Sequence, residues 1–222
     1  MGAVAGPMLS NEDLWELRQL VEQVGSQHLG VYPATMSGWE VVQQVGVARG
    51  SNFSDMGADT TVLVIASDLE EEAPIWWLRT KSAVERGATL ITLNTRDTRL
   101  DHIYNEKKPL NRYALRYAYG QAVEAVNYLV AKLLEGNSLD AALESRATRL
   151  ADLRQQSKAG AARPDYDARL ERLATCENLV VIVGAEGLSL DQHADLMRAV
   201  GNLLVVTGHV GRPNNGLTPV GW

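Results

Sequence analysis

Apolar residues gather in two strand–helix–strand patterns along this chain, at Thr61–Leu93 and Leu179–Val206. The first run of each pattern is β-branched and apolar on both faces, which is typical of a central strand in a parallel sheet. In the first pattern, Pro74 stands where a helix would begin and Gly87 where it would end. Because strand–helix–strand units close almost always in the parallel, right-handed form, the sequence predicts an α/β fold.

The second pattern predicts its own helix and a returning strand. Leu179–Val183 is the first strand, and Ser189 with Gln192 forms a capping-box pattern for the helix that follows. We expect this helix to end at Gly201 and a strand to follow at Leu203–Val206. The remaining tail is rich in glycine and proline and is expected to be irregular.

Three helices and no strand are expected between the two units, from Asn94 to Cys176. The predicted helices are Tyr113–Leu134, Leu139–Lys158 and Pro164–Ala174. The chain is thus interpreted as one domain over 1–222 with a helical insertion at 113–176.

The N-terminal part is expected to hold the end of a strand and two helices. Ser10 or Asn11 can cap a helix over Ser10–Val24, and its leucines and valines fall on one face. The other expected elements are a strand end at Ala3–Ala5, a loop at Gly30–Thr35, a short helix at Ser37–Val45 and an irregular segment at Gly46–Asp59.

Composition narrows the function classes. A chain of 222 residues with 45% hydrophobic content can bury one substantial core. Its net charge of -6 argues against a nucleic-acid partner, which demands a basic face. No apolar run approaches the roughly 20 residues that span a bilayer, so no direct membrane insertion is expected. A single cysteine excludes an internal disulfide and fits a reducing compartment.

Polar residues follow the strand of the first unit. Ser67 and Asp68 come directly after it, at the edge of a parallel sheet where phosphorylated ligands are usually held. They are candidate ligands of a ribose or a base. The three glutamates that follow are better explained as charges that complement the N-terminal end of a helix dipole.

A second candidate loop follows the strand that ends near Leu93. Asn94 and Arg96 can grip a phosphate there, since a guanidinium binds phosphate in bidentate fashion. The arginines of this loop can equally form salt bridges with Asp97 and Asp101, and the sequence does not decide between the two.

Glycines mark two further candidate loops. Gly184 and Gly187 form half of a dinucleotide fingerprint, or simply permit a tight turn. After the last expected strand, the permissive residues suggest backbone close to a ligand or ordinary turns. The candidates in that loop are Gly208, Gly211, Asn214 and Gly216.

Catalytic and metal-binding residues are not predicted. The four histidines have no i, i+4 relation, one cysteine cannot replace four thiolates, and no G-x-S-x-G motif is present. Trp76 and Trp77 are adjacent on a predicted helix, so one is expected in the core and the other at an interface.

Four segments of the chain carry a family resemblance. The longest is T-T-V-L-V-I-A-S-D-L-E-E-E-A-P-I-W-W-L-R-T-K-S-A-V-E-R-G-A-T-L-I-T-L-N-T-R-D-T-R-L-D. The others are S-N-E-D-L-W-E-L-R-Q-L-V, G-V-A-R-G-S-N-F-S-D-M-G and N-L-L-V-V-T-G-H-V-G-R-P-N-N-G-L-T-P-V. These segments resemble the molybdopterin oxidoreductase family, and within it the large iron–sulfur subunits of bacterial NADH–quinone oxidoreductase, respiratory complex I. They cover 85 of the 222 residues, while the range 139–176 has no counterpart.

This resemblance implies a Rossmann-like three-layer α/β domain. In molybdoenzymes of the family the strand-end loops hold a pterin-guanine dinucleotide, and the ten loop residues named above match those positions. The family's metal ligand aligns with Val31 in G-V-Y-P-A-T-M-S-G-W, and valine cannot ligate a metal. The family's iron–sulfur cysteines are absent as well.

The resemblance therefore implies a fragment of an electron-transfer subunit. It would hold no redox centre itself and would dock other subunits of the respiratory complex on the cytoplasmic side of the inner membrane. Iron–sulfur clusters are expected elsewhere in the parent subunit. The alternatives are a fragment of a true molybdopterin enzyme such as formate dehydrogenase, and a stand-alone nucleotide-binding module.

Overall fold

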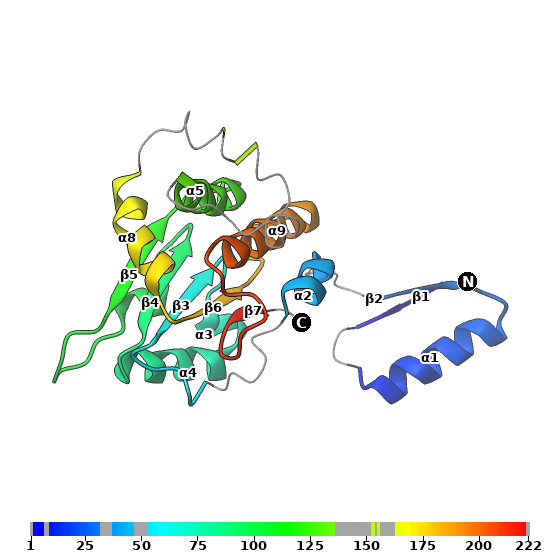
Figure 1. The fold of residues 1–222 in the computed structure, drawn as a ribbon. Helices are drawn as coiled ribbons and strands as arrows, with labels where there is room; N and C mark the ends of the chain where they lie inside the picture. The colour runs from blue at the N-terminus through cyan, green and yellow to red at the C-terminus, as the bar shows by residue number, and fades with distance from the viewer. Residues whose placement is uncertain are drawn as a thin grey trace.

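The computed structural model describes residues 2–6, 9–31, 37–46, 53–135, 152–153, 155 and 163–220. Its centre is a parallel five-stranded sheet with the strand order β5-β4-β3-β6-β7 (Figure 1). The sequence prediction of a Rossmann-like three-layer α/β fold is confirmed. The strands are β3 (Thr60–Ile65), β4 (Thr89–Asn94), β5 (Arg112–Arg116), β6 (Asn178–Val183) and β7 (Gly216–Pro219).

Helices cover both faces of this sheet (Figure 1). Leu63 and Ile65 point from β3 into one core, whereas Val62 and Val64 point into the other, as the alternation along a strand requires. The first core is covered by α2 (Trp39–Val45), α5 (Ala122–Glu135), α8 (Pro164–Thr175) and α9 (Leu190–Val206). The second is covered by α3 (Leu69–Glu72) and α4 (Pro74–Glu85).

The first predicted strand–helix–strand unit is confirmed, but the region after it differs from the prediction. Arg112–Arg116 forms the edge strand β5 and pairs in parallel with Leu90–Asn94, where a helix from Tyr113 was predicted. The sequence did not reveal this strand because it is only five residues long, is half exposed and has just three apolar residues between two arginines. The range 113–176 therefore begins inside the sheet, and its first helix starts only at Ala122.

The second unit differs at its far end. Helix α9 opens with the predicted Ser189 capping box but continues through Gly201 to Val206, so the predicted strand at Leu203–Val206 is wrong. Gly201 lies where α9 meets α2. A Cβ there would stand 2.8 Å from Val41 Cγ1. The glycine thus permits close helix packing and does not end the helix.

The other helix predictions have mixed outcomes. Helix α8 confirms the prediction at Pro164–Ala174. The prediction at Leu139–Lys158 lies almost wholly outside the described residues.

The N-terminal segment forms a small strand–helix–strand unit beside the main sheet (Figure 1). Its strands β1 (Gly2–Ala5) and β2 (His28–Val31) pair in parallel, and α1 (Asn11–Gln23) connects them. The Ser10 side chain, one of the two caps that the sequence allowed, caps α1 and forms a capping box with Asp13. The loop predicted from Gly30 is wrong at its start, because Gly30 pairs within β2.

Among the residues described, no helix combines the length and the apolar character that crossing a membrane would require.

Substituting Gly201 tests the close contact between α2 and α9. We expect Gly201→Ala to lower the free energy of unfolding by about 1–3 kcal/mol, because the added methyl overlaps Val41. Urea unfolding measures the loss. Gly201→Ala combined with Val41→Ala should lose less than the sum of the two single changes, since Val41→Ala frees the space. Gly57→Ala is the control, because its nearest atom would lie at 3.9 Å. Additive losses would contradict this explanation.

Candidate functional site

The loops that follow β3 and β4 are fastened to each other at the carboxyl edge of the sheet. The Ser67 N–H donates to Asn94 Oδ1 at 3.1 Å, and Asn94 Nδ2 donates to the Ser67 carbonyl at 2.9 Å. Both residues are buried, so each amide group is satisfied inside the protein. Ser67 and Asn94, both predicted to bind a ligand, are thus brought together. The side-chain amide of Asn94, however, binds the backbone of Ser67.

The loop after β6 packs directly onto this pair. Ser67 Oγ donates to Glu72 Oε2 at 2.8 Å. A Cβ on Gly184 would stand 2.5 Å from the Ala66 carbonyl oxygen and 2.8 Å from Glu72 Oε2. Gly184 is therefore required because the three loops meet without space between them.

Arg96 bridges two loops at the rim of this contact. Its guanidinium lies 2.9 Å from Asp68 Oδ2 and 2.6 Å from Glu186 Oε1. Asp68 also accepts the N–H of Glu70 at 3.3 Å and so caps α3. Of the two alternatives that the sequence left open, Arg96 thus forms salt bridges, but with other partners than Asp97 and Asp101, which pair with Arg116.

The second glycine of the half fingerprint forms a turn. Gly187 has φ +72°, and a Cβ there would meet the Tyr119 ring at 2.9 Å. Both the backbone conformation and the space favour glycine at this position.

Acidic groups outnumber basic ones at this edge. Asp68 and Glu186 both pair with the Arg96 guanidinium, and the Glu72 carboxylate is close enough to both acids to be affected by their charges. Burial raises the pKa of Glu72, and the neighbouring Glu186 and Asp68 add to that effect, while the Ser67 hydrogen bond opposes it. Glu72 and Glu186 were not singled out in the sequence, since only the fold brings them to Ser67 and Arg96.

A buried hydroxyl lies beside this acidic cluster. Burial raises the pKa of Tyr117, and the charge of Glu186 adds to the shift. Neither the Tyr117 hydroxyl nor Glu186 Oε2 has a hydrogen-bond partner among the described residues.

The other four predicted residues lie at the opposite edge of the sheet. Because α9 extends to Val206, the loop that contains Gly208 and Gly211 returns to the start of the strands, and Asn214 and Gly216 lead into β7. There, Asn215 Oδ1 accepts the N–H of Leu179 at 2.7 Å. The prediction that this loop follows the last strand is therefore wrong, because the helix α9 precedes it.

A histidine and a cysteine meet at this opposite edge. His209 Nε2 lies 3.0 Å from the Cys176 carbonyl oxygen. Burial lowers the pKa of His209 and raises that of the Cys176 thiol.

The described side chains at the carboxyl edge do not fit the pyrophosphate of a dinucleotide. A pyrophosphate needs convergent donors, whereas the guanidinium groups of Arg96 and Arg116 at this edge are already paired with carboxylates. Two of the helix starts at this edge are capped by side chains, α3 by Asp68 and α9 by Ser189. Within the described ranges, no group of three His, Cys, Asp or Glu residues could hold a metal ion.

Neutralising Glu72 tests the electrostatics of this edge. Because its folded pKa is raised, the stability that the neutral acid provides is present at low pH and lost as the pH rises through that pKa. Glu72→Gln keeps an acceptor for Ser67 without the charge. We expect a gain at pH 8 on the order of 1 kcal/mol after solvent screening, and no gain at pH 4. Urea unfolding at both pH values measures it.

The matched control for this experiment is Glu71→Gln on the same short helix. Glu71 is exposed, so its change should have little effect at either pH. A destabilised Glu72→Gln protein at pH 8 would show that the ionised carboxylate is the form that the fold prefers.

Removing Arg96 tests the bridge. Arg96→Ala leaves Asp68 and Glu186 without their guanidinium, and we expect a loss of about 1 kcal/mol that is larger at low salt. Adding Glu186→Gln should recover part of the loss. Arg18→Ala removes an exposed pair with Glu22 and serves as the control. Equal losses for Arg96→Ala and Arg18→Ala would contradict a special role of the bridge.

Comparison with known proteins supports the fold. No family model and no curated protein matches the chain. Among solved structures, the formyltransferase/hydrolase complex FhcABCD from Methylorubrum extorquens, solved with methylofuran, is similar with a TM-score of 0.55 and 13% identity. The match covers 99% of this chain and 53% of that chain.

Acetylene hydratase from Pelobacter acetylenicus is similar with a TM-score of 0.56 and 15% identity, over 90% of this chain and 28% of that chain. This chain thus spans about half of the first protein's chain and less than a third of the second's. At these identities the likeness concerns the fold alone.

Proposed function

We propose that this chain is an α/β domain of the large iron–sulfur subunit of an NADH–quinone oxidoreductase. In that assembly it acts as a scaffold and docking domain and holds no redox centre itself. Electrons pass from NADH to quinone through iron–sulfur clusters held elsewhere. The partners are the other subunits of the respiratory complex, which carry the domain on the cytoplasmic side of the inner membrane.

The closed carboxyl edge is the observation that carries this proposal. The segment at 60–101, which resembles the molybdopterin oxidoreductase family, forms β3, α3, α4, β4 and the 3-10 helix η1 (Arg99–His102). The α/β fold that this resemblance implies is therefore present. Ser67, Asn94 and Gly184 use the space at the strand ends for contacts among themselves, and the surplus carboxylates repel an anionic ligand. Such a domain keeps its packing surfaces without a redox role.

Two other functions remain as outcomes of the test. A true molybdopterin oxidoreductase, such as a formate dehydrogenase, and a stand-alone nucleotide-binding module both need an anion site at this edge. The excess of carboxylates there disfavours both.

Purification from the host tests the proposal. The chain, with an affinity tag in its native polypeptide, is isolated from gently solubilised membranes. We expect NADH–quinone reductase activity and iron to co-purify with it, and molybdenum to stay at the background of an unrelated tagged protein. Iron and molybdenum are measured by mass spectrometry, and pterin by its fluorescence after oxidation.

Two results would overturn the proposal. Stoichiometric molybdenum with pterin fluorescence would identify a molybdoenzyme. Micromolar binding of NADH or GDP to the same preparation in titration calorimetry, without co-purifying reductase activity, would favour a nucleotide-binding module.

A further inference from the structure

A buried histidine joins the start of α9 to the segment that carries α2. His193 is fully buried, and its Nδ1 accepts a hydrogen bond from the backbone N–H of Ser37 at 3.0 Å. A backbone N–H can only donate, so Nδ1 must be the unprotonated ring nitrogen, and the proton of the neutral imidazole is on Nε2. The contact therefore requires a neutral histidine.

The start of the segment 37–46 lies directly on α9. The Ser37 hydroxyl donates to the Leu190 carbonyl oxygen. Gly38 has φ +78°, and a Cβ there would stand 2.7 Å from Met197 Cβ. The segment thus approaches α9 so closely that the bond to the histidine cannot lengthen without moving the backbone.

Helix α2 connects two parts of the molecule. It lies between the N-terminal unit of β1, α1 and β2 and the main sheet (Figure 1). Val41 and Val42 of α2 are buried in the first core. Just after α2, the Gly46 carbonyl oxygen accepts the N–H of Leu217 in β7 at 3.4 Å. A change at His193 would therefore affect both the cover of this core and the connection to the N-terminal unit.

A protonated imidazole does not fit this site. Protonation of Nδ1 would place its new N–H opposite the Ser37 N–H, so two donors would face each other. The Ser37 hydroxyl oxygen lies 3.5 Å from Nδ1, which is longer than an ordinary hydrogen bond. Nε2 has no hydrogen-bond partner among the described residues. His193 is also the fourth residue of α9, near the positive end of the helix dipole, which disfavours a cation.

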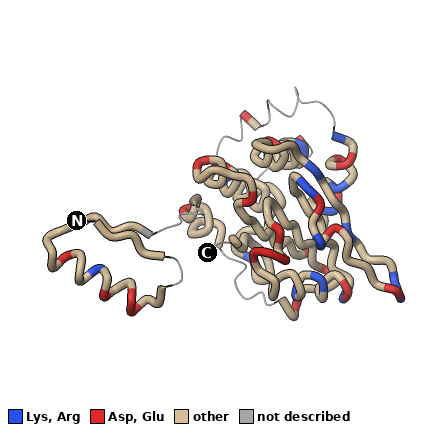
Figure 2. The backbone as a smooth tube through the Cα atoms, turned by 180° about the vertical axis from the view of Figure 1, so that it is seen from behind, with Lys and Arg blue, Asp and Glu red and all other residues tan. Residues whose placement is uncertain are grey.

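No charged side chain among the described residues compensates for the burial of this imidazole. Burial lowers the pKa of His193, the backbone of Ser37 and Gly184 opposes that shift, and no side-chain charge contributes to it. Figure 2 shows where the charged residues of the surrounding elements lie. The ionisable side chains on these elements include Glu40 on α2, Glu124 and Tyr128 on α5, Asp191, Asp195 and Arg198 on α9, and Glu186 after β6.

We propose that His193 is a pH-sensitive switch that holds the segment 37–46 on α9 only while its imidazole is neutral. In acid, protonation of Nδ1 breaks the bond to the Ser37 N–H, and α2 separates from α9. The released imidazole is solvated and regains an ordinary pKa of about 6.5. Because the released form binds the proton more tightly, the closed form is favoured above that pH and loses stability as the pH falls below it.

Hydrogen exchange of the whole chain, followed by mass spectrometry, tests this switch. We expect the protection of the amides in α2, corrected for the intrinsic pH dependence of exchange, to fall about tenfold between pH 7 and pH 5. Protection in β3 should change by no more than about twofold, because the main sheet does not depend on the state of His193.

Replacing His193 with glutamine removes the titration. In His193→Gln, the side-chain oxygen can still accept from Ser37, and the amide is not protonated in this pH range. We expect the protection of α2 in this variant to change by no more than about twofold between pH 7 and pH 5, whatever its absolute level.

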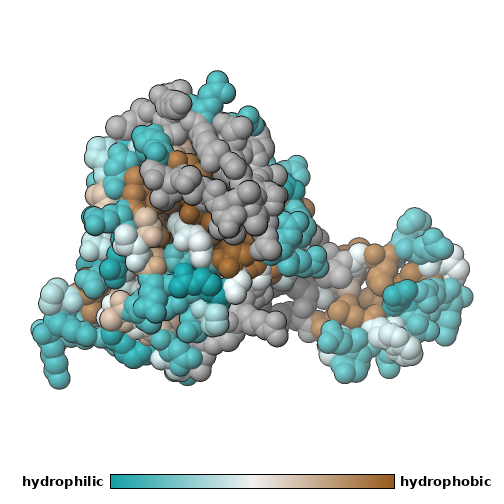
Figure 3. Space-filling model, viewed as in Figure 1, coloured by the Kyte–Doolittle hydropathy of each residue, from teal (hydrophilic) through white to brown (hydrophobic). Residues whose placement is uncertain are grey.

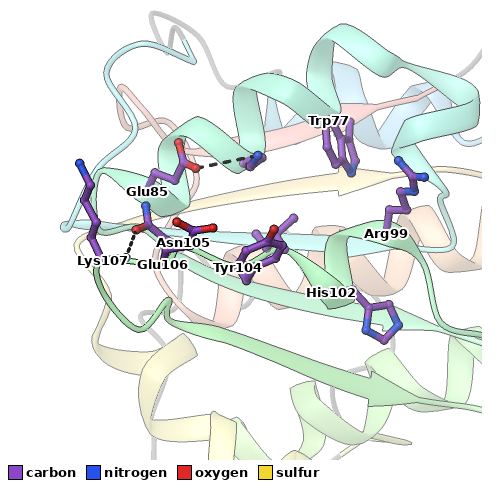
Figure 4. Close-up of a pocket in the computed structure, with 10 residues that line it drawn as sticks. Trp77, Glu85, Arg99, His102, Tyr104, Asn105, Glu106 and Lys107 are labelled. Atoms are coloured by element: carbon purple, nitrogen blue, oxygen red, sulfur yellow. Dashed lines mark hydrogen bonds and ion pairs between the residues drawn. The ribbon is translucent and has the colours of Figure 1, made fainter.

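Two matched variants control for other titrating groups. The His102 imidazole is exposed and lines an open groove beside α4, which covers the other face of the sheet (Figure 4). His102→Gln should therefore keep the full pH dependence of α2. Glu40→Gln should keep it as well, although it removes the only ionisable residue of the segment 37–46 and its ion pair with Arg198.

Nitrogen NMR of the unsubstituted protein, labelled at its imidazoles, gives a readout that needs no variant. Protonation of His193 should occur over the same pH range as the loss of protection in α2. Three results would contradict the switch. These are protection of α2 that stays constant down to pH 5, an equal loss in His193→Gln, and protonation of His193 while α2 stays protected. None of these measurements depends on the complex to which the chain belongs.

Discussion

The contact between the loops that follow the three central strands is the constraint on which the rest of the structure depends. Ser67 after β3 binds Asn94 after β4, and Gly184 after β6 packs on Ala66. Any side chain on Gly184 would push these strand ends apart. This close approach holds the loops of the carboxyl edge in place and partly buries Glu72. At the surface, Arg96 bridges the loops that follow β3 and β6. The charge balance of the site therefore follows from packing.

The central part of the fold could be predicted from the sequence because β3, β4 and β6 are buried on both faces. Their apolar runs have strand length, and Pro74 and Ser189 mark the starts of α4 after β3 and of α9 after β6. The errors arose where tertiary contacts outweigh local signals. β5 is a half-exposed edge strand, and Gly201, which would weaken an isolated helix, is retained in α9 because α2 packs against it.

The sequence predicted which residues meet after the central strands, but it did not predict which of them form hydrogen bonds or ion pairs with each other. Polar residues after parallel strands must meet at one edge, so the sequence could place Ser67, Asn94 and Gly184 together. It could not show that Arg96 reaches Glu186, 90 residues further along the chain, because this pairing depends on the relative placement of two loops. The misplaced group around Gly208 followed directly from the error in the length of α9.

The N-terminal unit of β1, α1 and β2 has little interior of its own. Val4 is 73% exposed, and Leu20 and Val24 are about half exposed, so apolar side chains gather on its surface (Figure 3). Since local stability follows buried apolar contact, this unit should open and refold independently at a low free-energy cost while the main sheet stays intact. Amide hydrogens of Ala3–Ala5 would then exchange with solvent long before those of β3. The chain would then contain two cooperative folding units with very different free energies of unfolding.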